Sequence, residues 1–128
     1  MKLFSFLFIS IIFLTVIISS NKIFAQQQDP YLPFAQVMPQ PKGGLSEIYK
    51  NITYPDLAKR DGIEGKVYLL VYINENGNVD KVKVIKSLGG GCDEAAIKGI
   101  KSVKFTPAEN KGVPVKVKLS LAITFKLQ

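Results

Sequence analysis

Apolar and polar residues alternate without a break along the last part of the chain. From Val115 to Leu127 every odd-numbered residue is apolar, and the even-numbered ones are Lys116, Lys118, Ser120, Ala122, Thr124 and Lys126. A period of two over thirteen residues predicts one long strand with one face buried and the other in solvent. Such a strand must pair with others, and its place at the end of the chain raises the question of whether one edge stays open.

Two further strands are predicted upstream of it. Gly65–Ile73 carries apolar residues on both faces, which is typical of a central strand. Asn76-Gly77 then predicts a hairpin, because both residues accept a positive φ, and Val79–Ser87 forms the second strand. Apolar residues at helical spacing from Asp93 onward predict a helix that ends near Phe105.

Two short helices are predicted before the first strand. Leu45–Asn51 places its apolar residues on one face, and Asp56–Asp61 follows Pro55, which is tolerated in a first helical turn. Gly62 suits the left-handed residue that ends such a helix. This order of elements predicts an α+β fold, with a three-stranded antiparallel sheet in the order 2-1-3 and helices packed on one face. The second and third strands would be the edges.

The chain begins with a segment typical of export. A short basic start, an apolar run and a small residue at Ala25 predict a signal peptide over residues 1–25, and an uncleaved membrane anchor is the alternative interpretation. Residues 26–44 contain four prolines and two glycines, which predicts a linker, and its nineteen residues reach at most roughly 65 Å when extended. Residues 45–128 are the predicted folded domain.

Composition excludes most catalytic chemistry. The chain has no histidine, so neither a Ser/His/Asp nor a Cys/His site can be built, and the sequence predicts no enzyme, no metal site and no cofactor. Cys92 is the only cysteine, and we expect it to be buried as a small apolar residue. Removing residues 1–25 takes two lysines from 17 basic residues, which leaves 15 against 10 acidic residues and a net charge of +5. The basic residues are spread along the chain, so nucleic-acid binding is not predicted.

Several motifs occur in an order that resembles a known family. They are Tyr54-Pro55-x-x-Ala58, Gly62-Ile63-x-Gly65-x-Val67, Asn76-Gly77-x-Val79, Val84-x-x-Ser87, Asp93-x-Ala95-Ala96, Phe105-x-Pro107-Ala108 and Gly112-x-Pro114-Val115. Each motif is weakly specific alone. The whole set in this order resembles the C-terminal domain of the energy transducer TonB, in a Bacteroidetes-type form, over about residues 45–128.

The resemblance implies a three-stranded antiparallel sheet with two helices packed on one face. It also implies a periplasmic domain that takes part in TonB-dependent transport. Such a domain recognises the TonB box, a short peptide of an outer-membrane receptor, which adds as a strand against the last strand of the sheet. Carried onto this chain, the peptide-binding residues are Asn51, Val115, Lys116, Val117, Lys118, Leu119, Ser120 and Leu121.

Two alternatives remain open at this point. The chain could be a truncated energy transducer anchored in the inner membrane by its N-terminal segment, although the family's anchor carries a histidine and its proline-rich rod is longer than residues 26–44. It could also be a structural module that forms a homodimer through its edge strands.

Overall fold

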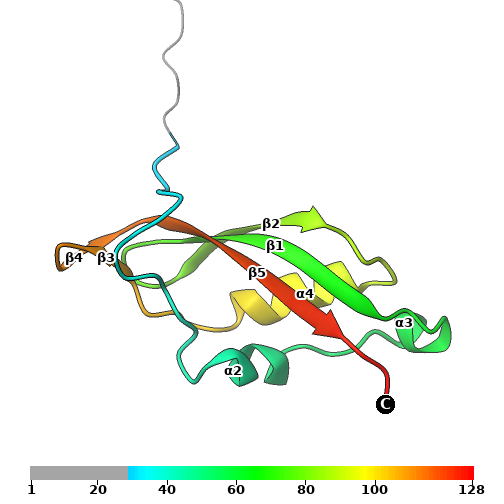
Figure 1. The fold of residues 1–128 in the computed structure, drawn as a ribbon. Helices are drawn as coiled ribbons and strands as arrows, with labels where there is room; N and C mark the ends of the chain where they lie inside the picture. Colours follow the sequence, from blue (N-terminus) through cyan, green and yellow to red (C-terminus); the bar gives the residue numbers. More distant parts are fainter. Residues whose placement is uncertain (1–28) are drawn as a thin grey trace, which may run out of the picture.

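The computed structural model describes residues 29–128 (Figure 1). The predicted signal peptide or anchor, residues 1–25, lies outside the described residues. The elements in chain order are α2 (Leu45–Lys50), α3 (Asp56–Arg60), β1 (Gly65–Ile73), β2 (Val79–Lys86), α4 (Cys92–Lys101), β3 (Ala108–Asn110), β4 (Val113–Val115) and β5 (Val117–Phe125). None of the helices within residues 29–128 has the length and apolar character needed to cross a membrane.

The main sheet has the predicted topology. Its three strands are antiparallel in the order β2-β1-β5, so β1 is central and the C-terminal strand is an edge. Nine residue pairs join β1 to β5, from Gly65 opposite Phe125 to Ile73 opposite Val117. The predicted hairpin joins β1 to β2, and Gly77 adopts φ 81° in its turn, but Asn76 does not take the positive φ that the Asn-Gly prediction assumed for both residues.

One face of this sheet is the core and the other faces solvent. The odd-numbered residues of β1 from Val67 to Ile73 are fully buried and share one apolar cluster with Ile48 of α2, Ala58 of α3 and Ile100 of α4. Figure 1 shows α4 crossing this face and α2 lying alongside β5. Because side chains alternate along a strand, the even-numbered residues of β1 and β5 lie on the outer face of the sheet.

The predicted C-terminal strand is wrong in its extent. Residues 113–115 belong to β4, which forms a separate two-stranded hairpin with β3, and the strand of the main sheet spans only Val117–Phe125. The alternation of apolar residues stays in phase across Lys116, so no sequence signal marks the change of partner. The helix α4 also ends earlier than predicted, at Lys101, although Val103 and Phe105 beyond it are still buried.

The segment expected to be a linker packs against the domain instead. We call residues 29–42 the N-terminal strap. Leu32 forms a parallel bridge with Val117, Val37 an antiparallel bridge with Glu109, and Ala35 is only 1% exposed. Proline lacks an N–H group, but the residues between the prolines keep theirs. The N–H groups of Leu32 and Val37, which lie between prolines, and of Lys42, which follows Pro41, donate hydrogen bonds to the domain.

Candidate functional site: the edge of β5

The outer edge of β5 presents the backbone groups of its even-numbered residues. Lys118 donates its N–H to the carbonyl of Leu32, at 2.9 Å, and therefore points away from β1. In an antiparallel pair, residues whose backbone groups point toward the neighbouring strand alternate with residues whose groups point away. The N–H and C=O groups of Ser120, Ala122 and Thr124 consequently point outward as well.

Both ends of this edge are occupied by the protein itself. At the start of the strand, Leu32 of the strap accepts from Lys118 N–H and donates to Lys116 C=O, each at 2.9 Å. Near the end, Thr124 donates its N–H to the hydroxyl of Tyr49 in α2, at 3.1 Å.

Between these contacts, no group within residues 29–128 forms a hydrogen bond with the outward backbone of Ser120 or Ala122. We call the backbone of these two residues the open edge. Each has one unused donor and one unused acceptor, which is what an added strand requires.

The structure places the predicted peptide-binding residues of the last strand in several different surroundings. Val115 lies in β4, and Lys116, Val117 and Lys118 lie where the strap covers the edge. Leu119 and Leu121 pack against the core on the inner face and are partly buried. Ser120 is exposed on the open edge. The accessible stretch is therefore shorter than predicted and lies nearer the end of the strand.

Asn51 is placed at the end of α2. Its side-chain amide donates to the carbonyl of Glu47, at 2.8 Å, and its own N–H donates to Ile48 at the helix terminus. The residue ends the helix, as an asparagine in this position commonly does. Its neighbour Tyr49, which sequence reasoning missed, is the residue of α2 that reaches the edge of β5. No pattern in the sequence links Tyr49 to Thr124, because their contact depends on how α2 packs.

Aromatic and charged contacts hold the strap at the start of β5. The ring of Tyr31 packs edge-on against Tyr72, with centroids 5.0 Å apart, and its hydroxyl donates to Asp80 at 2.6 Å. This hydrogen bond to a carboxylate raises the pKa of Tyr31 to about 12, because ionising the hydroxyl would place two negative charges together. Asp29 forms an ion pair with Lys118, which lowers the pKa of the Asp29 carboxyl and raises that of the Lys118 amine.

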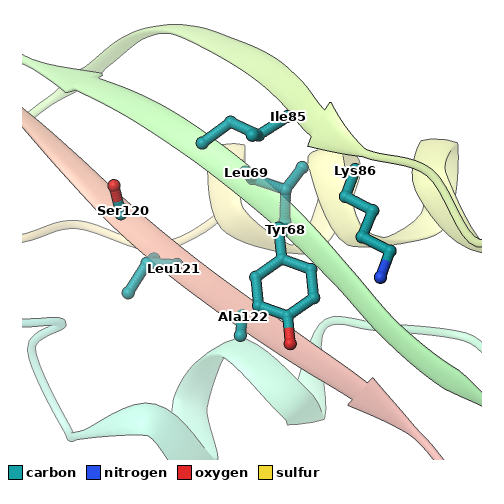
Figure 2. Close-up of a pocket in the computed structure, with 7 residues that line it drawn as sticks. All are labelled: Tyr68, Leu69, Ile85, Lys86, Ser120, Leu121 and Ala122. Carbon is teal, nitrogen blue, oxygen red and sulfur yellow. The ribbon is translucent and has the colours of Figure 1, made fainter.

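A shallow pocket of about 530 Å³ lies beside the open edge, on the outer face of the sheet. It is lined by Tyr68, Leu69, Ile85, Lys86, Ser120, Leu121 and Ala122. Figure 2 shows the ring of Tyr68 standing between Lys86 of β2 and Ala122 of β5. The amine of Lys86 lies 5.8 Å from the centre of that ring. The pocket is thus bordered on one side by the unused backbone groups of β5.

Metal ligands and the thiol are the other chemical features of the domain. No group of three metal-ligating side chains comes together in the part of the chain that the structure describes. Cys92, the one thiol, is fully buried as predicted, and burial raises its pKa. The features that remain are an unpaired strand edge, a pocket and a set of lysines.

Comparison with known proteins agrees with this fold and its topology. The family described as Gram-negative bacterial TonB protein C-terminal matches residues 50–127. Protein TonB of Vibrio cholerae is 34% identical over 100 residues, which are 77% of this chain and 36% of that protein. Protein tonB2 of Pseudomonas aeruginosa is 39% identical over 75 residues, which are 58% of this chain and 28% of that protein. The matched region thus spans about a third of the length of these relatives.

Solved structures show the same likeness. The solution structure of the Helicobacter pylori TonB C-terminal domain is 30% identical and covers 63% of this chain and 86% of its own, with a TM-score of 0.51. That of the Pseudomonas aeruginosa domain is 27% identical and covers 60% of this chain and 79% of its own, also with a TM-score of 0.51. The motifs, the sheet order and these matches agree, and the chain belongs to the family of TonB C-terminal domains.

Proposed function

We propose that the protein binds a short peptide of an outer-membrane receptor, the TonB box, by adding it as a strand to the open edge of β5. The role is that of a binding module in TonB-dependent transport, and it needs no catalytic group or cofactor. The protein would act in the periplasm, either after loss of residues 1–25 or anchored by them in the inner membrane.

The observation that supports this proposal is the unused backbone of Ser120 and Ala122. An edge strand with free donors and acceptors is a template for another chain, and proteins that do not use such an edge usually cover it. Here the two ends are covered, by Leu32 and by Tyr49, while the middle is left accessible. This pattern fits a docking site of limited length.

The site as described supports modest affinity. Ser120 and Ala122 offer two N–H and two C=O groups, and each backbone hydrogen bond is worth about 0.5–1.5 kcal/mol net. A peptide must also lose its own flexibility when it binds. Displacing Leu32 would lengthen the edge by Lys116 C=O and Lys118 N–H but would cost the contacts of the strap.

Substituting Ser120 tests the proposal at a single backbone group. Ser120→Pro removes the outward N–H, and proline is tolerated on an edge strand where that group faces solvent, so the fold should survive. Ser120→Ala is the matched control, because it removes the hydroxyl and keeps the N–H. We expect labelled TonB-box peptides to bind the wild type and Ser120→Ala alike and to bind Ser120→Pro about two- to tenfold more weakly.

The measurement is fluorescence anisotropy with the full chain, together with amide chemical shifts from residues 117–125. Circular dichroism checks that each variant is folded. Peptide binding that is unchanged in Ser120→Pro, or shifts confined to another part of the domain, would contradict strand addition along β5.

Two experiments separate this function from its alternatives. Mass spectrometry of the N-terminus of the protein in its native membrane fraction distinguishes a cleaved periplasmic binder from an anchored transducer. Sedimentation over a range of micromolar concentrations tests whether two copies pair through their edges, and a monomer at every concentration would exclude the structural dimer.

A further inference from the structure

The outer face of the sheet is strongly basic, and within residues 29–128 the strap covers it only near Tyr72 and Lys118. Its lysines are Lys66, Lys81, Lys83, Lys86 and Lys118. Lys66 is itself an even-numbered residue of β1, and each of the others lies opposite an even-numbered residue of β1. Asp80 is the only acidic residue in the three strands, and Tyr31 and Asn74 both donate hydrogen bonds to it. With Asp29 of the strap, which pairs with Lys118, the face therefore carries five lysines and two carboxylates that already have partners.

Tyrosine rings lie among these lysines. Tyr68 is 39% exposed, and the amine of Lys86 is positioned over its ring. Lys118 and Lys81 approach Tyr72 in the same way, at 5.9 and 5.3 Å from the ring centre. Lys118 is engaged by Asp29, so Lys86 is the amine beside the pocket that forms no ion pair within residues 29–128.

Small residues of β5 open a path from the edge to the pocket. Ala122 lies directly opposite Tyr68, and Ser120 lies opposite Leu70. A strand added to β5 would lie about 4.8 Å beyond it, with alternate side chains on the outer face. Because Ala122 has no atoms beyond Cβ, a long side chain of that added strand can pass over it and rest against the ring of Tyr68.

We propose that the outer face selects an acidic peptide with one bulky apolar residue, which lies over Ala122 in the pocket beside Tyr68 and Ile85. The carboxylates of the peptide lie near Lys86 and the other lysines of this face. This inference rests on the proposed strand addition and adds its specificity. The backbone of β5 sets the register of the peptide, and the outer face of the sheet determines which peptide side chains are accepted.

Three synthetic peptides of equal length test the assignment. The first is acidic with a central phenylalanine, the second is acidic with a central alanine, and the third keeps the phenylalanine but replaces each glutamate with lysine. Binding to the full chain, kept in solution with a mild detergent, is measured by fluorescence anisotropy at low and at moderate salt. We expect the first peptide to bind about tenfold more tightly than either of the others, with the charge preference weakening as salt rises.

Two variants and one control test which residues cause the preferences for phenylalanine and for acidic peptides. Ala122→Leu fills the path beside Tyr68 and should remove the preference for phenylalanine over alanine, while leaving the preference for acidic peptides. Lys86→Glu should reduce the charge preference several-fold. Lys98→Glu, on the exposed surface of α4 at the opposite face of the sheet, makes the same change of charge and should alter neither preference.

The outcomes separate the two proposals. If all three peptides bind equally and this binding is weakened in Ser120→Pro, the selectivity of the face is overturned and strand addition stands. If discrimination survives in Ser120→Pro, the selectivity of the face is supported and strand addition is overturned. A preference for the basic peptide would overturn the inference outright.

Discussion

The turn between β1 and β2 offers a sharp test of how this fold is held together. Gly77 sits in the turn with φ 81°, and a Cβ atom built there would lie 2.0 Å from the carbonyl oxygen of Phe105. Gly112, in the turn between β3 and β4, has φ 75° and no atom within 4 Å of such a Cβ. The substitutions Gly77→Ala and Gly112→Ala therefore share the same backbone strain and differ in the steric clash.

The expected magnitudes follow from these contacts. A left-handed conformation costs alanine about 1–2 kcal/mol, and the reduced freedom of the unfolded chain returns about 0.4–1 kcal/mol, so Gly112→Ala should destabilise by about 1 kcal/mol. Gly77→Ala must also separate the turn from Phe105. That breaks the hydrogen bond from Phe105 N–H to Gly77 C=O, worth about 1 kcal/mol, and disturbs a fully buried phenylalanine. We expect about 3–5 kcal/mol in total: the strain and the lost hydrogen bond give about 2 kcal/mol, and displacing the phenylalanine adds part of the roughly 3–5 kcal/mol that losing its whole side chain would cost.

Urea denaturation followed by far-ultraviolet circular dichroism measures both free energies of unfolding. A difference of about 2 kcal/mol corresponds to roughly 10 °C in the midpoint of thermal unfolding for a domain of this size. Equal destabilisation by the two substitutions would show that backbone strain alone matters at Gly77. It would refute the argument that the turn is locked against the segment after α4.

Three further outcomes are expected. Tyr49→Phe removes the partner of Thr124 N–H and should lower the free energy of unfolding by about 1 kcal/mol in urea titrations, while faster amide exchange at Thr124 shows that the effect is local. An ultraviolet titration should find that Tyr31 ionises near pH 12. That ionisation should be absent in Tyr31→Phe, and the pKa of Tyr31 should return toward 10 in Asp80→Asn. Because this pKa is raised in the folded protein, the stability that the strap contact contributes is complete below pH 10 and is lost as the pH approaches 12. The thiol of Cys92 should react with a disulfide reagent only as fast as the domain unfolds, so labelling without urea on the timescale of a free thiol would contradict its burial.

Much of the fold could be predicted from local patterns. Gly65–Ile73 matches β1 residue for residue, because a central strand with apolar residues on both faces leaves a strong signal. The turn at Gly77 and the end of α3 at Gly62 also followed from glycines that adopt positive φ, although Asn76 does not adopt it as predicted. These features depend on neighbours in the chain, which is why a sequence can reveal them.

The candidate site was predicted only in part. The last strand was correctly placed at an edge of the sheet, but its accessible portion is Ser120–Ala122 and not the stretch from Val115 onward. Leu32 covers Lys116 and Lys118 from more than eighty residues away in the chain, and the prolines around Leu32 favoured a linker there. Tyr49 closes the other end across a similar separation.

The difference between what the sequence predicted and what only the structure showed has a simple physical cause. The period of side chains and the turn residues determine which segments become strands, which faces they bury and in what order they pair, because those choices depend on local geometry and on removing apolar surface from water. Which backbone groups of β5 are left without a partner depends on where the strap and α2 come to rest. That is decided by packing between distant segments, and it can be seen only in the folded protein.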